Sequence, residues 1–595
     1  MSEKKTIRIG GASGFWGDSM VGAPQLVNSG LIDFLVFDYL AETTMAILAA
    51  AQARDPQRGY ATDFVDTAMK QVLPEVMRQG IKVVANAGGI NPRGCADALQ
   101  ALAETMGLSP RIAVVSGDDV SALLPSLRQD GIRDMYTDAP LPDSMLSANA
   151  YLGAFPIASA LDAGADIVIT GRCVDSATTL GPLIHAFCWT PDDLNQLAAG
   201  SLAGHIIECG CQATGGLHTD WQSVPDWPNM GYPIIECHAN GDFDLIKPPD
   251  TGGVVKRAAV VEQMLYEIGD PGAYELPDVS CDFRPVEIDQ IDNGRVRISG
   301  AVGNTPTETY KVSATALDGF RCAGSMVIIG IDAAAKAQRT GEAVLTRSRT
   351  LLKAAGFADF TRTAITLFGA ESLYGQNART GQSREVMVRI VADHPVKDAL
   401  KLFAREISPA GTSWSPGTTS PGGGRPSPSM LIKPLSFLLD KAALSPEFSI
   451  AGVTCAASQH APRVITTPAP PTEPPAWPAT QENTVTLPLV KLALARSGDK
   501  GDIANIGLVA RQPEWLPLLW ARVTPEAVRD YFAPLVKGDV ERYYLPGVSA
   551  INYVMHDALD GGGPASCRMD PLGKGLGQML LDMPVSVPVS IAAQL

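Results

Sequence analysis

The alternation of strand-like and helix-like segments in the N-terminal third of the chain constrains the fold more than any other feature. Five short runs rich in Ile, Val and Phe end in polar or glycine-rich turns and lead into helical patterns; they cover residues 6–14, 33–42, 81–94, 111–119 and 166–176. The runs mostly lack polar alternation, which indicates strands buried on both faces. Strand followed by helix, repeated five times, predicts an α/β fold with a doubly wound, mainly parallel sheet over residues 1–203.

The pattern changes near Gly204, where an eight-stranded α/β barrel would have continued it. Residues 204–221 and 232–255 contain shorter apolar runs interrupted by glycine-containing turns, which predict short strands. Helical periodicity returns later in the same part of the chain. We therefore expect a second lobe of mixed strands and helices, an α+β arrangement, over residues 204–460.

Two segments are dense in glycine, proline and serine. Residues 408–429 predict an irregular loop, because such a composition disfavours both helix and strand. A proline-rich run within residues 461–483 predicts a stiff, extended linker and a domain boundary. Behind it, residues 484–595 form a small α+β domain that opens with a strand, turns through the charged stretch 496–502 and resumes with a second strand.

Composition limits the classes of partner. The formal net charge of −16 argues against nucleic acid and against anionic membranes, because both need a basic protein surface. No apolar run approaches the ~18 residues of a membrane-spanning helix, and the first residues lack the apolar segment of a signal peptide. The ten cysteines follow no disulfide spacing, so we expect reduced thiols and a cytoplasmic protein.

A glycine triplet, Gly11, Gly14 and Gly17, follows the first strand and resembles a nucleotide-binding turn. Asp38 ends the second strand, where a dinucleotide-binding fold places an acid against the ribose. Against this interpretation, none of the 13 tyrosines is followed by lysine at the fourth position, as short-chain dehydrogenases require, and Pro24 interrupts the helix that should receive the pyrophosphate. An NAD(P)-dependent oxidoreductase therefore remains only an alternative.

Ligands of an open parallel sheet bind beyond the carboxyl ends of its strands, and this rule nominates the functional residues. For proton transfer we predict Asp38, Glu42, Asp175 and Glu208. Arg172 would hold a carboxylate through a two-pronged hydrogen bond, and Asn86, Gly88 and Gly89 would stabilise an oxyanion. The predicted binding residues are Gly11, Ser13, Gly14, Asn86, Gly88, Gly89, Asn91, Arg172, Gln212, Thr251, Gly252, Gly253, Arg496 and Lys500. Ordinary turns and helix caps explain any one of them equally well.

A cysteine- and histidine-rich stretch follows the five strands. His205, Cys209, Cys211 and His218 are ligand types for zinc, but their spacing matches no common zinc motif, and we expect no metal. Glu208 or Cys209 beside Gln212 offers acid–base chemistry instead. No serine stands in a Gly-x-Ser-x-Gly turn, which argues against an α/β-hydrolase.

Six motifs, in order along the chain, together resemble the acyclic terpene utilisation family; they are "IRIGGASGFWGDS", "NAGGINPRG", "VITGRCVDSA", "IIECGCQATGG", "PPDTGGVV" and "LARSGDKGDIANIG". The resemblance implies a role in the degradation of terpenoids such as citronellol and geraniol. In that route a branched acyl chain becomes a coenzyme A thioester and is carboxylated, hydrated and cleaved. The resemblance also implies a ferredoxin-like fold for residues 484–595.

These observations together favour a lyase that adds or removes water, or cleaves a carbon–carbon bond, in a branched carboxylated acyl thioester or hydroxy acid. Coenzyme A would enter as part of the substrate, and no separate cofactor is expected. The alternative is a non-catalytic subunit that binds an acyl thioester or a partner enzyme. We expect a homo-oligomer in either case.

Overall fold

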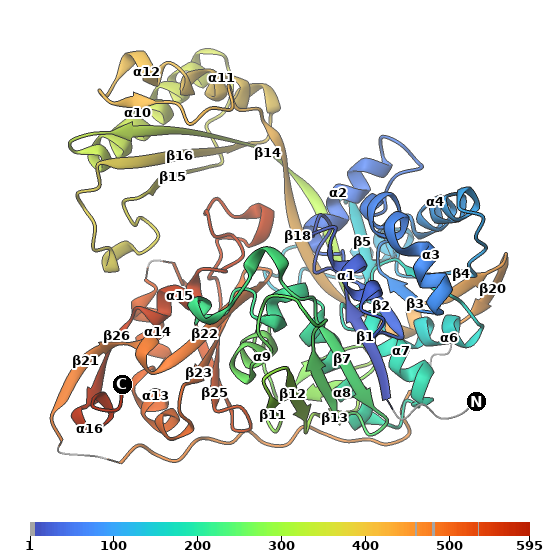
Figure 1. Ribbon diagram of the computed structural model, residues 1–595. Helices are drawn as coiled ribbons and strands as arrows, with labels where there is room; N and C mark the ends of the chain where they lie inside the picture. The colour runs from blue at the N-terminus through green and yellow to red at the C-terminus, as the bar shows by residue number, and fades with distance from the viewer. Residues whose placement is uncertain (1–5, 458–460, 479–481, 534) are drawn as a thin grey trace.

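The computed structural model describes residues 6–457, 461–478, 482–533 and 535–595 (Figure 1). Its largest sheet has the strand order β11-β12-β8-β7-β1-β2-β3-β6-β4-β19-β20. The five strands predicted from the sequence are parallel and adjacent at its centre; they are β1 (Thr6–Gly11), β2 (Phe34–Phe37), β3 (Lys82–Ala85), β6 (Ile167–Thr170) and β4 (Ile112–Ser116). The predicted α/β class and parallel sheet are confirmed.

Both faces of this sheet are buried, as the apolar runs indicated. In β2, Phe34 and Val36 belong to one hydrophobic core, and Leu35 and Phe37 belong to another on the opposite face. The first core is shared with α6 (Phe155–Asp162), α7 (Ala177–Phe187) and α8 (Leu194–Ile207). The second is shared with α1 (Gly22–Asn28), α3 (Lys70–Gln79, preceded by a π-helical turn, Phe64–Met69) and α4 (Pro92–Thr105).

The sheet continues through antiparallel strands beyond the predicted boundary at residue 203. On one side lie β7 (Ile234–His238), β8 (Phe243–Ile246), β12 (Arg295–Ser299) and β11 (Glu287–Asp292); on the other lie β19 (Glu447–Ile450) and β20 (Val453–Ala456). The boundary itself falls inside α8, so residues 204–207 are helical where the sequence predicted a strand. Because α8 is buried on nearly all sides, it lacks the polar face by which a helix is recognised.

Two long strands lead out of the body into a separate lobe, which we call the arm and define as residues 318–428 (Figure 1). The strands are β14 (Thr309–Ile329) and β18 (Ser429–Asp440), and the first half of β14 also pairs with β5 (Ser147–Ala150). The arm contains β15 (Arg362–Phe368), β16 (Glu385–His394), α10 (Ala333–Ala354) and α11 (Lys397–Ile407). The segment predicted to be irregular contains only α12 (Ala410–Ser413), β17 (Thr418–Thr419) and the start of β18.

The C-terminal domain is built on an antiparallel sheet, β22-β23-β25-β24, and a second pair, β21 with β26. Their bounds are β21 (Thr484–Pro488), β22 (Ala493–Lys500), β23 (Ile503–Ala510), β24 (Val540–Leu545), β25 (Ala550–Met555) and β26 (Pro584–Pro588). The helices are α13 (Leu516–Arg522), α14 (Pro525–Tyr531), α15 (Leu576–Leu581) and α16 (Val589–Ala592).

The charged stretch 496–502, predicted to be a turn, is mostly strand. Only Gly501 and Asp502 separate β22 from β23, and the positive φ of Gly501, +66°, makes the tight turn. Charged residues at 496–500 remain in a strand because their side chains reach partners in the main body, as described below.

The smaller elements complete the main body. They are α2 (Glu42–Gln52), α5 (Leu124–Gln129), α9 (Arg257–Met264) and a small sheet of β9 (Tyr274–Glu275), β10 (Ser280–Asp282) and β13 (Val302–Asn304). Across the described residues, none of the helices combines the length and the apolar character needed to cross a lipid bilayer.

Residues 461–478 of the predicted linker have no regular structure but are bound to the main body. The Arg463 amide donates to Asp192 Oδ1 at 2.6 Å, and the Thr466 amide donates to Thr305 Oγ1 at 2.8 Å. Arg284 Nη2 donates to the Ala469 carbonyl at 2.6 Å. The linker is therefore held against the body along this part of its length, while residues 479–481 of it lie outside the described residues.

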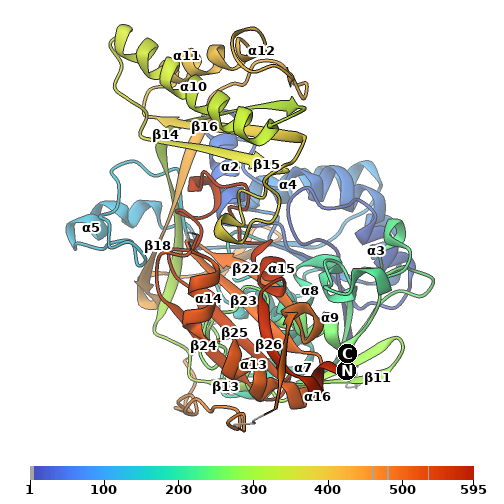
Figure 2. The same ribbon diagram turned by 90° about the vertical axis from the view of Figure 1, so that its left-hand side faces the viewer.

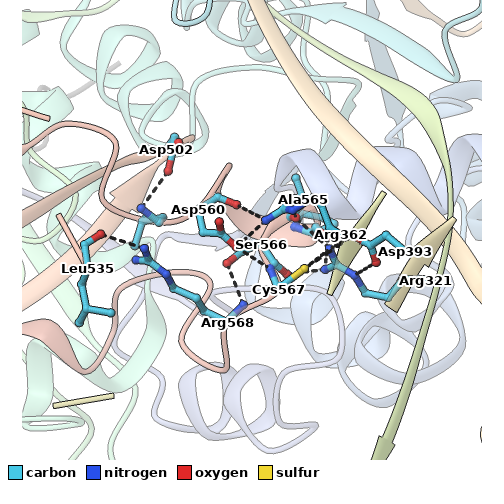
Figure 3. Close-up of polar contacts among 12 residues, drawn as sticks. Arg321, Arg362, Asp393, Asp502, Leu535, Asp560, Ala565, Ser566, Cys567 and Arg568 are labelled. Carbon is cyan, nitrogen blue, oxygen red and sulfur yellow. Dashed lines mark hydrogen bonds and ion pairs between the residues drawn. The ribbon is translucent and has the colours of Figure 1, made fainter. Parts of the chain in front are cut away.

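The arm touches the C-terminal domain through a cluster of arginines (Figures 2 and 3). The Arg321 guanidinium forms a two-pronged ion pair with Asp393, 2.7 Å at each bond, and its remaining donors reach carbonyls of residues 564–566. Arg362 pairs with Asp560 and also donates to the Ala565 carbonyl at 2.8 Å. Arginines of the arm thus hold a loop of the C-terminal domain.

Candidate functional site

The glycine-rich turn after β1 is filled by the protein itself. A Cβ atom on Gly11 would lie 2.7 Å from the Ile207 carbonyl oxygen, and one on Gly14 would lie 2.9 Å from the Cys209 carbonyl carbon. The Gly11 amide donates to the Pro233 carbonyl at 3.1 Å, and the Gly14 amide donates to Asp18 Oδ2 at 2.9 Å. These glycines admit the end of α8 where a dinucleotide fold would admit a pyrophosphate, and both amides are bonded within the fold. The structure therefore offers the oxidoreductase alternative no free donor at this turn.

The other predicted glycine donors are also used within the fold. The Gly88 amide donates to the Thr170 carbonyl at 3.0 Å, and the Gly89 amide to the Asn86 carbonyl at 3.4 Å. The amides of Gly252 and Gly253 donate to carbonyls of residues 229 and 225, at 2.7 and 2.9 Å. The amides of Gly88 and Gly89, which were expected to bind an oxyanion, therefore donate to backbone carbonyls at the end of β6 and in the loop after β3.

Three polar residues predicted to bind ligand have structural roles in this fold. Asn91 caps α4, as its position before Pro92 predicts: its Oδ1 accepts from the Gly94 amide at 3.0 Å, and its Nδ2 donates to the Arg58 carbonyl at 2.9 Å. Ser13 Oγ donates to the Asp38 carbonyl at 3.1 Å. Thr251 Oγ1 donates to the Pro248 carbonyl at 2.6 Å, and none of the three is left free for a substrate.

A group of ionisable side chains lies at the carboxyl ends of the parallel strands. Its members contact one another directly or shift one another's pKa values. We call this group the central cluster; it consists of Asp38, Glu42, Tyr151, Arg172, Asp175, His205, Glu208, Lys311 and Lys500. It contains all four residues that the sequence predicted for proton transfer. It also contains the predicted anchor Arg172 and one residue of the C-terminal domain, Lys500.

Arg172, which follows β6, is the most deeply buried cation of the cluster, with 3% of its side chain exposed. Its Nη1 donates to Asp175 Oδ1 at 2.7 Å and to the Cys173 carbonyl at 3.0 Å, and its guanidinium lies 4.1 Å from the centre of the Tyr151 ring. Among the described residues Nε finds no hydrogen-bond partner, although it is buried, and no bond involves Nη2. The two donors that together grip a carboxylate are therefore available.

Asp118 positions the loop that carries Arg172. Its Oδ2 accepts from the Arg172 amide and from Asn149 Nδ2, each at 2.8 Å. Burial raises the pKa of Asp118 to about 6, even though both hydrogen bonds favour the charged form. The backbone at Arg172 thus depends on a carboxyl group that titrates within an accessible pH range.

His205 and Glu208 form a buried acid–base pair at the end of α8. His205 Nε2 lies 3.1 Å from the Met264 carbonyl, to which it must donate because a carbonyl only accepts. His205 Nδ1 then faces Glu208 Oε1 at 3.0 Å, so one proton lies between them. Burial, and after it the nearby Asp175, raise the pKa of Glu208, whose side chain is 13% exposed and is the outer member of the pair.

Asp38 is the second carboxyl group suited to proton transfer. Asn86 Nδ2 donates to Asp38 Oδ1 at 2.5 Å, and Asn86 Oδ1 accepts from the Tyr39 amide at 2.7 Å, so Asn86 orients Asp38 and is not free for substrate. Burial first, and then the charges of Asp175 and Glu208, raise the pKa of Asp38 well above its ordinary value. A raised pKa suits the Asp38 carboxyl group to donating a proton.

The C-terminal domain lines the outer side of the cluster. Lys500 Nζ lies 3.5 Å from Glu267 Oε2, and Lys574 Nζ lies 2.8 Å from Glu267 Oε1 and 2.9 Å from Asp499 Oδ1. Arg496 donates to Gln212 and lies 4.9 Å from the centre of the Tyr266 ring. The predicted pair Gln212 and Arg496 therefore meet, but as an interdomain contact beside the cluster.

The chain matches two family models, one over the main body and arm and one over the C-terminal domain. The family model described as "Acyclic terpene utilisation family protein AtuA" matches residues 7–450, and the model described as "AtuA ferredoxin-like domain" matches residues 487–586. The chain belongs to the acyclic terpene utilisation family. No curated protein and no solved structure matches this chain.

In this AtuA-family chain, the residues considered for zinc do not come together as a set. His205 pairs with Glu208, and His218 Nδ1 lies 2.5 Å from Glu262 Oε2. The group of metal-ligand types found among the described residues is Glu236, His238 and Asp244. Its two carboxylates already pair with three arginines, Arg8, Arg295 and Arg297, which supply the positive charge that a metal would bring.

The sequence did not indicate several residues that lie in or beside the central cluster. His205 was considered only as a metal ligand, yet its spacing of three from Glu208 on a helix predicts contact between the two. Tyr151 and Lys311 carried no signal, because they follow or lie in strands outside the parallel set. Glu267 and Lys574 meet only through the docking of two domains, which no local pattern shows.

Proposed function

We propose that this chain is a lyase that acts on a branched, carboxylated acyl thioester or hydroxy acid in the use of acyclic terpenes. The observation that carries the proposal is Arg172, a buried guanidinium with an unpartnered Nε, next to two carboxyl groups of raised pKa. A buried donor left unpaired is costly in a folded protein, so an acceptor from a ligand is the natural partner. The substrate carboxylate supplies that acceptor.

The two carboxyl groups divide the proton transfers between them. For loss of water, the Glu208–His205 pair takes a proton from the α-carbon, and Asp38 gives a proton to the β-hydroxyl as its C–O bond breaks. For carbon–carbon cleavage, the pair takes the hydroxyl proton, the bond between the α- and β-carbons breaks, and the acid protonates the resulting enolate carbon. Either reaction needs one base and one acid, each worth roughly 10²–10⁴-fold in rate.

The proposal also covers the ligand and the partners of the protein. If the substrate is the thioester, coenzyme A enters as part of it, with the acyl end at the central cluster. The net charge of −16 argues against nucleic acid or an anionic membrane surface as a partner. The proposal also includes a cytoplasmic location and a homo-oligomeric state. Sedimentation of the purified protein measures the oligomeric state directly.

The test is mass spectrometry of products after incubation with 3-hydroxy-3-isohexenylglutaryl-coenzyme A, with and without a divalent metal. Loss of water or release of acetate is expected from the wild type and not from Arg172→Gln. Asp162→Asn, at a surface histidine–aspartate pair, is the matched control and should keep full activity. Thermal stabilisation by the thioester without turnover would favour the binding-subunit alternative over the lyase.

A further inference from the structure

Lys311 is a half-buried cation whose nearby counter-charge, Glu42, acts on it without a direct ion pair among the described residues. It lies in the part of β14 that stays in the main body, and its Nζ is 5.7 Å from the centre of the Tyr151 ring and 5.5 Å from that of Tyr136. Within the part of the chain that the structure describes, the Lys311 ammonium makes no ion pair and no hydrogen bond. An ammonium has three donors, so this side chain offers a binding point to an anion.

Lys500 approaches the same place from the C-terminal domain. A Cβ atom on Gly501, the next residue, would lie 3.7 Å from the Tyr136 ring, so the hairpin between β22 and β23 touches the aromatic residue that Lys311 also faces. The ion pair of Lys500 with Glu267 is long, at 3.5 Å, and Glu267 is shared with Lys574. Lys500, with 41% of its side chain exposed, thus keeps donors free on the solvent side of the cluster.

The pKa of Glu42 shows how these cations act on a carboxylate placed among them. Its Oε1 accepts from the Tyr151 hydroxyl at 2.6 Å. Burial alone raises the pKa of Glu42, but Lys311, Arg172 and Lys500 together lower it to about 2. The three cations together outnumber Glu42, and donors of Arg172 and Lys311 remain for a second anion beside it.

We infer that the substrate is a short dicarboxylic acid, with one carboxylate on the free donors of Arg172 and the second on Lys311 and Lys500. This inference rests on the proposed function and chooses, from the two classes named there, the hydroxy acid with two free carboxylates. Arg172 and Lys311 contact one ring, at 4.1 and 5.7 Å from its centre, so the two binding points are separated by no more than those two lengths combined. That distance suits the ends of one small branched diacid and is too short for the reach from a thioester carbonyl to the phosphates of coenzyme A.

The test compares two acids that share a hydroxyl and a methyl branch and differ by one carboxyl group. Calorimetric titration of the full-length protein with 3-hydroxy-3-methylglutarate should show binding about tenfold tighter than with 3-hydroxy-3-methylbutanoate, because one more charge-assisted contact is made. Lys311→Met and Lys500→Met should each remove that preference, because each weakens binding of the diacid more than binding of the monoacid. Lys353→Met, at an exposed position on α10, is the control and should retain the preference.

Each other outcome has a definite meaning. Equal binding of the two acids, or a preference that survives both lysine substitutions, overturns the second carboxylate site while leaving the Arg172 site and the lyase proposal standing. Tighter binding of an acyl-coenzyme A that depends on Lys311, with no preference for the diacid, assigns the lysines to phosphate and also overturns the inference. Failure of both acids to bind the folded wild type overturns the inference; the proposed function falls with it only if the coenzyme A thioester is also neither bound nor turned over.

Discussion

The Nδ1 atom of His205 lies 3.0 Å from Oε1 of Glu208, inside the protein and at the end of one helix. The opposite ring nitrogen donates to a carbonyl, so the two side chains share one proton. Burial lowers the pKa of His205, but the adjoining Glu208 raises it by more, and the net direction is upward. The histidine thus acts as the partner that keeps Glu208 able to accept a proton.

Replacing His205 with Asn should change the pH dependence of turnover more than its maximum. His205 lowers the pKa of Glu208 by charge and by its hydrogen bond, so its removal raises that pKa further. Because the base must be deprotonated, the acid limb of kcat/KM against pH should move to higher pH. Asp162→Asn should leave the profile in place, and an unmoved acid limb in His205→Asn would show that the pair is not the base.

Asp118 predicts a pH-dependent stability. Its pKa is about 6 in the folded protein against an ordinary value of 3.8, so the folded state holds the proton more tightly than the unfolded state. Stability contributed by the protonated group is therefore complete below pH ~4 and is lost as pH rises through 6, a difference of order 3 kcal/mol. Asp118→Asn, which cannot ionise, should gain Tm relative to wild type as pH rises from 4.5 to 7.5. A Tm difference that is constant over this range would contradict the assignment.

Gly14→Ala tests the packing of the first turn against the end of α8. The added Cβ would lie 2.9 Å from backbone atoms of Cys209, and backbone cannot move aside as a flexible side chain can. We expect a loss of about 1–3 kcal/mol in the free energy of unfolding and a loss of turnover, because Glu208 precedes Cys209. Gly411→Ala, which would meet no atom within 4 Å, is the matched control and should unfold like the wild type in urea.

Arg321→Met should loosen the contact between the arm and the C-terminal domain. Asp393 is fully buried, and removal of its two-pronged partner leaves a carboxylate without compensation, at a cost of about 3 kcal/mol or more. Amide hydrogen exchange should accelerate at residues 560–567, the loop in which Arg321 binds the carbonyls of residues 564–566. Lys401→Met removes an exposed ion pair with Asp398 and should change the free energy of unfolding by less than ~1 kcal/mol.

The parallel half of the sheet was predictable because its strands are local apolar runs with clear turns. Asn91 and Pro92 even marked the first turn of α4 correctly. The extension of the same sheet beyond α8 was not predictable, since strands as distant as β11 and β20 join it only through tertiary pairing. A helix buried on all sides, such as α8, likewise carries no periodic polar signal.

In the candidate site, too, residues with a local sequence signal were predictable, and residues brought in by tertiary contacts were not. Asp38, Arg172 and Asp175 were found because chain order places them after parallel strands, and the strand-end rule applies to them directly. For the glycines, the sequence shows that something approaches the backbone closely, and does not show whether that neighbour is a ligand or the chain itself. At Gly11 and Gly14 the neighbour is the chain.

The contribution of Lys500 and Lys574 to the outer side of the cluster also fixes when the site can exist. During synthesis the parallel sheet, with Asp38 and Arg172 in place, is complete long before either lysine has been made. Up to that point in the chain, Asp38 and Asp175 have Arg172 beside them but lack the two lysines of the C-terminal domain. Lys500 reaches the central cluster only when the C-terminal hairpin has docked against the main body.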